Sequence, residues 1–158
     1  MNIVIIGVGL IGGSVALAIR GFNTHIIGVD SNADHANKAL ELGIIDEISD
    51  LDNALHKAQL IILAIPVDAA RKLLPYILDN IQDNTVVIDM GSTKVGICNN
   101  VRSHARRSQY VASHPMAGTE NSGPEAAFAD LFKGKKTIIC EKELSADFAL
   151  QQAELLYK

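Results

Sequence analysis

The feature that most constrains this chain is a regular alternation of short β-branched runs with segments of helical periodicity. The runs are rich in Ile and Val and lack strict polar alternation, which is typical of parallel strands covered on both faces. They comprise Ile3–Ile6, His25–Val29, Leu60–Ile65, Thr85–Ile88, Tyr110–Ala112 and Thr137–Cys140, with a weaker run at Glu47–Ser49. Strands that alternate with helices predict a parallel sheet joined by right-handed crossovers.

The helical segments place apolar residues on one face at the spacing of an α-helix. They comprise Ile11–Arg20, Ala33–Leu42, Val67–Leu78, Thr93–Arg107 and Ser145–Lys158. Gly43 is placed to end the second of these helices, and Ser145 is placed to cap the start of the last. No linker or repeat divides the sequence, and 158 residues suit one domain over residues 1–158.

Composition narrows the classes of partner. The 14 Lys and Arg residues against 18 Asp and Glu leave a net charge of −4, which gives no electrostatic reason to expect nucleic acid. Cys98 and Cys140 lack metal-ligand spacing, so we expect no metal, no disulfide and a reducing cytoplasm. Residues 1–19 carry no charge, but four glycines interrupt them and no basic residue precedes them, so we expect neither signal peptide nor membrane span.

A glycine fingerprint follows the first predicted strand and opens the first predicted helix. Residues Gly7–Gly12 read GVGLIG, which is the GxGxxG spacing. Gly7 permits a tight turn, Gly9 lets a pyrophosphate approach the backbone, and Gly12 lets the helix pack closely on the strand. This context predicts a dinucleotide-binding domain with the α/β fold of a doubly wound, mainly parallel Rossmann sheet, with helices on both faces.

The cofactor contacts expected around this fingerprint favour NAD over NADP. Backbone N–H groups at the start of the helix, at Leu10 and Ile11, are expected to face the phosphates. Asp30 ends the second strand, where its carboxylate can accept hydrogen bonds from the ribose hydroxyls and would repel a 2′-phosphate. The alternative for Asp30 is a helix N-cap, and the two roles are compatible.

Three further strand ends carry unusual residues. They are Ile65-Pro66-Val67, the segment Asp89–Lys94 and the segment Ser113–Gly123. In an open α/β sheet, ligands bind beyond the carboxyl ends of the strands near the topological switch. With the usual strand order, all three loops should face the nicotinamide end of the cofactor, with Ile65 and Pro66 among its contacts.

His114 is the strongest candidate for acid–base chemistry, in a loop at a strand end. An imidazole titrates near neutral pH and can take a proton from a hydroxyl undergoing oxidation. Pro115 restricts the backbone of His114 to extended values. The remaining histidines, expected on the surface or at caps, are His25, His35, His56 and His104. The basic residues expected as a solvated helix end are Arg102, His104, Arg106 and Arg107.

The residues around His114 each have a functional and a structural interpretation. Ser92 can cap the following helix, or its hydroxyl can orient His114 or bond the substrate hydroxyl. Lys94 can bridge to a substrate carboxylate or lie in solvent. Thr119 and Glu120 can line the same pocket or cap a helix.

These motifs resemble those of the prephenate/arogenate dehydrogenase family of tyrosine biosynthesis. The matching elements are Gly7–Ser14 (GVGLIGGS), Ile65–Val67 (IPV), Asp89–Lys94 (DMGSTK) and His114–Gly123 (HPMAGTENSG). The resemblance covers the whole chain but only the cofactor-binding half of the family. Members continue into a helical C-terminal domain that forms the homodimer and supplies an arginine for prephenate. The apolar helical end of this chain, at Gln151–Lys158, indicates by itself either a docked terminal helix or a chain that continues, and the resemblance implies the second, a further domain beyond this chain.

The resemblance implies NAD-dependent oxidative decarboxylation of prephenate to 4-hydroxyphenylpyruvate. His114 matches the catalytic histidine, which draws the proton from the ring hydroxyl as the hydride leaves. Ser92 matches the serine that positions this histidine, and Thr119 and Glu120 match positions at the substrate pocket. These loops do not distinguish prephenate from arogenate.

Two other functions compete with this one. A reductase or β-hydroxyacid dehydrogenase would share the glycine fingerprint, but those families usually act through a lysine beyond this stretch. A cofactor-binding module is the second alternative, because the expected second domain is missing from this chain. In either case the expected partners are small molecules.

Overall fold

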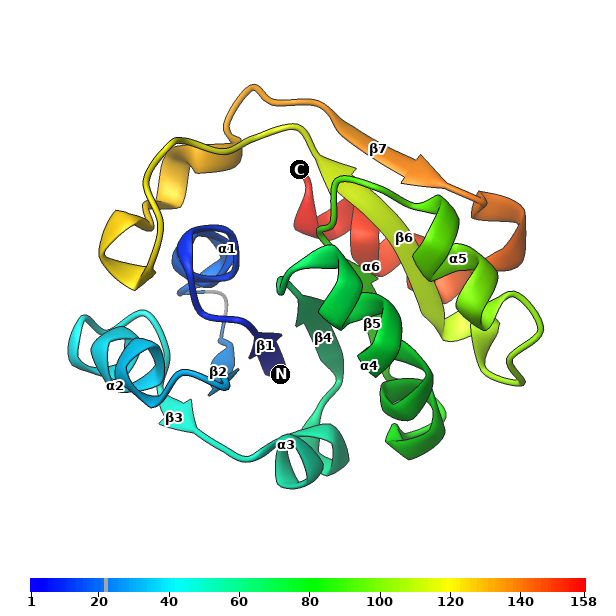
Figure 1. Ribbon diagram of the computed structural model, residues 1–158, viewed down its shortest axis with the longest axis horizontal. Helices are drawn as coiled ribbons and strands as arrows, with labels where there is room; N and C mark the ends of the chain where they lie inside the picture. The colour runs from blue at the N-terminus through cyan, green and yellow to red at the C-terminus, as the bar shows by residue number, and fades with distance from the viewer. Residues whose placement is uncertain (22) are drawn as a thin grey trace.

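The computed structural model describes residues 1–21 and 23–158 and has one seven-stranded sheet of order β3-β2-β1-β4-β5-β6-β7 (Figure 1). The strands are β1 (Asn2–Ile6), β2 (His25–Val29), β3 (Glu47–Ile48), β4 (Leu60–Leu63), β5 (Val86–Asp89), β6 (Tyr110–Pro115) and β7 (Thr137–Cys140). The first six strands pair in parallel, and β7 is antiparallel to β6. All seven predicted runs therefore form strands, and the mainly parallel sheet is confirmed.

Helices cover both faces of the sheet, as a doubly wound fold requires. They are α1 (Leu10–Ile19), α2 (Ala33–Glu41), α3 (Leu51–Lys57), α4 (Val67–Asn80), α5 (Val95–Val101) and α6 (Asp147–Leu156). In β1, Val4 and Ile6 pack in a core with α3, α4 and α5, whereas Ile3 and Ile5 pack in a second core with α1, α2 and α6. Both faces of the strand are buried, which explains its unbroken apolar sequence.

Two helix ends differ from the expectation. The helix predicted over Thr93–Arg107 ends at Val101, because the chain turns to bury Arg107, which is 5% exposed. The Arg107 guanidinium donates to the Tyr110 carbonyl over 2.9 Å. Ser145 does not cap the last helix, because its hydroxyl donates to the same Tyr110 carbonyl over 2.7 Å. Gly43 does end α2, with φ +67°.

The segment between β6 and β7, residues 116–136, forms an arch that leaves the sheet, crosses to α1 and returns (Figure 1). It contains two 3-10 helices, η2 (Pro124–Ala126) and η3 (Ala129–Phe132), which pack on α1. The backbone N–H of Phe128 donates to the buried Ser14 hydroxyl over 3.1 Å. A Cβ added to Gly13 would lie 2.9 Å from the Ala127 Cβ, so the two backbones approach closely there. The arch is thus fixed to the helix that follows the glycine fingerprint.

None of the helices in the described ranges combines the length and the apolar character that a bilayer crossing requires. Nor do residues 1–21 and 23–158 bring three metal-ligating side chains together. Both cysteines are free thiols. Burial raises the pKa of the Cys98 thiol to about 11, so this group stays protonated at neutral pH.

Candidate functional site

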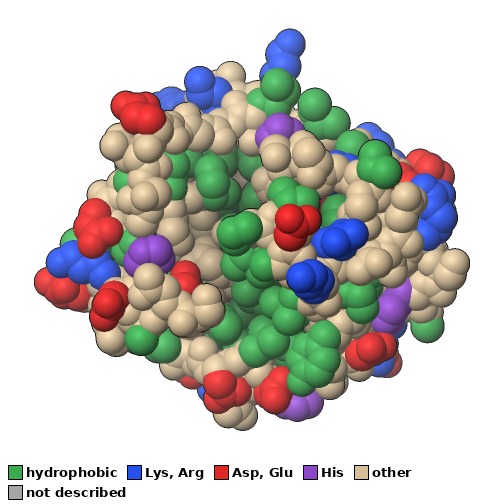
Figure 2. Space-filling model, in the orientation of Figure 1, with side chains coloured by type: hydrophobic (Ala, Val, Ile, Leu, Met, Phe, Trp, Pro, Cys, Tyr) green, Lys and Arg blue, Asp and Glu red, His purple; other side chains and the backbone are tan. Residues whose placement is uncertain are grey.

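The strand order puts the topological switch between β1 and β4, the two strands that precede the glycine fingerprint and the Ile65-Pro66 segment. The carboxyl ends of β5 and β6 lie further along the same edge of the sheet, because these strands run parallel to β4. Figure 2 shows this face of the molecule hollowed beside α1, beneath the arch. The predicted motifs therefore gather at one edge of the sheet.

The glycines of the fingerprint have different structural roles. Gly7 has φ +91°, and a Cβ there would lie 2.5 Å from the Ala64 carbonyl oxygen. A Cβ on Gly12 would lie 1.9 Å from the Gly7 oxygen, so a side chain at either position is excluded. A Cβ on Gly9 would meet no atom within 4 Å. Gly9 therefore leaves open space at the helix start, where a diphosphate can reach the backbone of Leu10.

The turn also contacts the segment that follows β4. A Cβ on Gly7 would lie 2.7 Å from Cγ2 of Ile65, so the Ile65 side chain packs directly against the glycine turn. Pro66 is the N-terminal cap residue of α4. Ile65 is thus next to Gly7, Pro66 follows it in the chain, and Ile11 lies partly buried at the start of α1.

Asp30 follows β2 and binds the glycine turn directly. Its Oδ2 accepts the backbone N–H of Val8 over 2.9 Å, and its Oδ1 accepts that of Asn32 over 2.8 Å. The N-cap of α2 is Asn32, whose side chain accepts from Asp34 and His35. The helix-cap interpretation of Asp30 is therefore wrong. The carboxylate is half-buried beside the turn, where its remaining lone pairs can accept ribose hydroxyls.

His114 lies in β6 rather than in a loop, which corrects the sequence-based expectation. The strand continues to Pro115 because β7 pairs with it, placing His114 opposite Ile138 and Pro115 opposite Thr137. The imidazole is half-buried, and within the described residues its ring nitrogens make no hydrogen bond. A strand holds the backbone of His114 more rigidly than the predicted loop would.

Ser92 lies on the loop after β5 and is exposed. The helix-cap interpretation is wrong, because α5 begins at Val95 after Lys94 and has no side-chain cap. Asp89 pairs with Ala112, so Ser92 and His114 follow neighbouring points of two adjacent strands. No hydrogen bond between the two is present in the part of the chain that the structure describes, and the predicted bond is not formed here.

Lys94 neither lies in solvent nor points to an open subsite. Its ammonium forms an ion pair with Asp89, and the two side chains are 11% and 1% exposed. Asp89 also accepts the Tyr110 hydroxyl over 2.8 Å. Burial and the adjacent Asp89 carboxylate raise the pKa of Tyr110, which keeps this hydroxyl a donor.

The sequence analysis named Asp89 only as part of a motif. The signal was available, since a carboxylate ending an apolar strand needs a partner.

Thr119 and Glu120 lie at the start of the arch, and both are exposed. The Thr119 hydroxyl accepts the backbone N–H of Asn121 over 3.1 Å, which is a local turn and not a helix cap. Glu120 and Asn121 line a shallow hollow on the arch, together with Glu125.

The basic residues after α5 are paired, contrary to the expectation of a solvated helix end. Arg102 and Arg107 bind Glu141, His104 binds Asp79, and Arg106 binds Asp83 and the Ile81 carbonyl. This cluster lies outside the candidate site.

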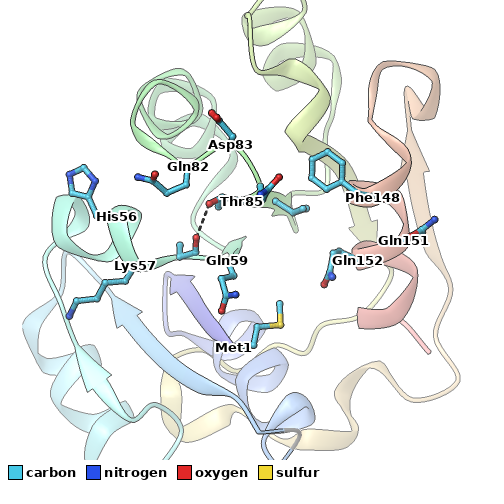
Figure 3. Close-up of a pocket in the computed structure, with 13 residues that line it drawn as sticks. Met1, His56, Lys57, Gln59, Gln82, Asp83, Thr85, Phe148, Gln151 and Gln152 are labelled. Carbon is cyan, nitrogen blue, oxygen red and sulfur yellow. Dashed lines mark hydrogen bonds between the residues drawn. The ribbon is translucent and has the colours of Figure 1, made fainter.

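A hollow lies at the opposite edge of the sheet, at the amino ends of the strands (Figure 3). Its volume is about 650 Å³, and its lining includes Met1, Gln59, Gln82, Thr85 and Phe148. None of the candidate site residues lines it.

A parallel sheet of this order, a glycine turn at its switch point and an acidic residue after β2 define a dinucleotide-binding domain of the Rossmann class. Residues 14–158 match the family model described as prephenate dehydrogenase, nucleotide-binding domain, and the chain belongs to this family.

Named relatives agree. The prephenate dehydrogenase of Bacillus subtilis is 34% identical in an alignment 162 residues long, which covers 99% of this chain and 44% of that protein. The crystal structure of prephenate dehydrogenase from A. aeolicus, in complex with hydroxyphenyl propionate and NAD+, superposes with a TM-score of 0.88 at 30% identity, covering 99% of this chain and 56% of that one. Synechocystis arogenate dehydrogenase gives 0.89 at 26% identity, covering 99% and 55%. The chain spans less than half the length of the curated relatives it matches.

Proposed function

We propose that this chain is the NAD-binding part of an enzyme that converts prephenate to 4-hydroxyphenylpyruvate by oxidation and decarboxylation. The observation that carries the proposal is the juxtaposition of two elements at one sheet edge. The open glycine turn beside Asp30 fits a dinucleotide, and His114 lies near the carboxyl end of β6, on the same edge of the sheet. Family membership and the named relatives support the same substrate class.

The residues of the chain have distinct proposed roles. The N–H groups of Gly9, Leu10 and Ile11 would bind the diphosphate, and Asp30 would bind the adenosine ribose. When bound, NAD supplies the acceptor for a hydride. Ile65 and Pro66 would contact the cofactor at the switch point.

His114 is the proposed general base. It would take the proton of the ring 4-hydroxyl as the hydride leaves the same carbon, after which loss of CO2 makes the ring aromatic. The ring nitrogens of His114 make no hydrogen bond within the described residues, which is in keeping with this role because no protein group there competes for them. Ser92 would orient the imidazole or the substrate hydroxyl, once the substrate draws the two together. Thr119 and Glu120 would line the substrate pocket.

Arogenate is the alternative substrate, since it differs from prephenate only in its side chain and a solved relative bears that name. A second alternative is that the chain alone binds NAD without turnover. We further propose that the complete enzyme is a cytoplasmic homodimer that dimerises through a segment outside residues 1–158.

The decisive experiment is spectrophotometric detection of NADH formation by the product of the full gene. Prephenate and arogenate are each offered with NAD and with NADP. We expect the fastest turnover with prephenate and NAD. Turnover with arogenate alone would reassign the substrate, and no turnover with either would reject the proposed reaction. Calorimetric titration of residues 1–158 with NAD tests cofactor binding separately.

A further inference from the structure

We infer that Asp89 is a positioning residue, whose buried carboxylate fixes the Ser92 loop against the strand that carries His114. The inference rests on the proposed function, because only a reaction at His114 gives this geometry a catalytic purpose.

The Asp89 carboxylate has four partners from two segments. On the Ser92 loop, Oδ2 accepts the Gly91 N–H over 3.0 Å and binds the Lys94 ammonium. On β6, Oδ1 accepts the Tyr110 hydroxyl over 2.8 Å and the Ser113 N–H over 3.3 Å. The Ser113 hydroxyl in turn donates to the Asp89 main-chain oxygen over 2.7 Å.

The positions of these partners make the network relevant to the site. Gly91 and Lys94 flank Ser92 on both sides, and Ser113 immediately precedes His114. Ser92 itself is exposed and makes no side-chain bond within the described residues, so its flanking residues determine its place. One carboxylate therefore sets the position of both candidate catalytic side chains.

Tyr157 provides an independent second link between the same two segments. Its hydroxyl lies 2.6 Å from the Ser113 hydroxyl and 3.3 Å from the sulfur of Met90, the residue after Asp89. It comes from the turn after α6, which packs on β5 and β6. Two separate side chains thus fasten the loop after β5 to the end of β6.

A buried ion pair adds little to stability compared with apolar residues of similar size, so stability alone does not account for it. The structural alternative is that the pair only supports the fold. The double substitution Asp89→Asn with Lys94→Met separates these roles, because it removes both charges together and leaves no buried charge unpaired.

Thr85→Val is the matched control. It removes a buried hydrogen bond of 2.7 Å to the Ala58 carbonyl at the other end of β5 (Figure 3).

The measurements use the product of the full gene. For the double variant we expect a kcat about 10- to 100-fold lower with prephenate, the loss expected when reacting groups move by about 1 Å. The Kd for NAD should stay within about twofold. Amide exchange at Gly91 and Ser113 should be at least about 10-fold faster. Thr85→Val should leave kcat and the exchange at Gly91 unchanged.

Tyr110→Phe keeps both charges and removes a single donor to Asp89, so it serves if the double variant does not fold. We expect a smaller effect, with kcat about threefold lower. Wild-type kcat in a folded double variant would overturn the inference, as would unchanged exchange at Gly91. If the wild type turns over neither substrate while exchange accelerates as expected, the proposed function fails and the anchoring of the loop by Asp89 stands.

Discussion

The polar groups at the amino ends of the parallel strands, here called the amino edge of the sheet, differ from those at the carboxyl ends, the carboxyl edge. At the amino edge, polar side chains close the strand ends, as when Gln59 accepts the Asn2 N–H over 2.8 Å and Thr85 donates to the Ala58 carbonyl. At the carboxyl edge, the side chains of Ser92, His114 and Glu120 make no hydrogen bond within the described residues. Buried groups such as Asp89 hold the backbone there instead.

The proposed site therefore lies apart from the hollow at the amino edge. This hollow has a volume of about 650 Å³, and its lining includes Gln59 and Thr85, whose side chains bond to the main chain near the amino ends of neighbouring strands. At the carboxyl edge, the side chains of Ser92 and His114 make no hydrogen bond within the described residues, while the backbone that carries them is held by buried groups. Such an arrangement suits binding and catalysis. The following predictions test this contrast.

The largest expected effect is that of His114→Asn on turnover. Removing a general base should lower kcat with prephenate by about 10³-fold, equal to about 4 kcal/mol, while the Kd for NAD stays nearly unchanged. Steady-state kinetics and calorimetry on the full gene product measure both. His25→Asn at the amino end of β2 is the control and should keep full activity. Undiminished turnover in His114→Asn would remove the assignment of this residue.

Two glycines of the turn should have different effects when replaced by alanine, Gly12 on stability and Gly9 on NAD binding. Gly12→Ala places a methyl group 1.9 Å from the Gly7 oxygen and should reduce the free energy of unfolding by about 3 kcal/mol or more. Gly9→Ala meets no atom and should leave stability unchanged, yet obstruct the diphosphate and weaken NAD binding about 10-fold. Denaturant unfolding and NAD titration distinguish the two variants. Equal stability of the pair would contradict the packing described here.

Asp30→Ala should weaken NAD binding by about 10-fold, or about 1.4 kcal/mol. Part of that loss comes from the Val8 N–H, which loses its acceptor, and this part applies to NADP as well. The repulsion of a 2′-phosphate also disappears, so NADP binding should fall less than NAD binding. An equal loss for both cofactors would show that Asp30 acts only through the turn.

The smallest effect is expected at the amino edge. Phe148 is 41% exposed at the rim of the large hollow, so Phe148→Ala should reduce the free energy of unfolding by less than about 1 kcal/mol. Activity and NAD affinity should be unchanged. A marked loss of turnover would mean that the two edges are coupled.

The sheet was predictable because its strands are buried on both faces and carry continuous β-branched runs, as in β4, where all four residues are buried. Helix α3 was not anticipated, since its seven residues bury only Ala54 and Leu55 and leave no clear periodicity. The glycine turn after β1 followed from the GxGxxG spacing, which is local in the sequence, whereas its place at the switch between β1 and β4 depends on the strand order.

The site was predictable as a set of residue types at strand ends, but not as a set of contacts. The Lys94 ammonium could have faced solvent or substrate, and only the three-dimensional structure shows Asp89 within its reach. The pairing of β6 with β7, which brings His114 into a strand, joins residues far apart in the chain. The arch docks on α1 through Ser14, which no local pattern indicates.

The bond between Ser14 and Phe128 joins residues 114 positions apart, and this has a consequence for biosynthesis. When α1 leaves the ribosome, the segment that will cover it has not yet been made. The glycine turn and α1 are therefore translated early, but the packing of the arch on α1 forms late, because non-local contacts form only after the intervening chain exists. A nascent chain that stalls before Ala127 would present an uncovered helix to the chaperones and proteases that monitor incomplete products.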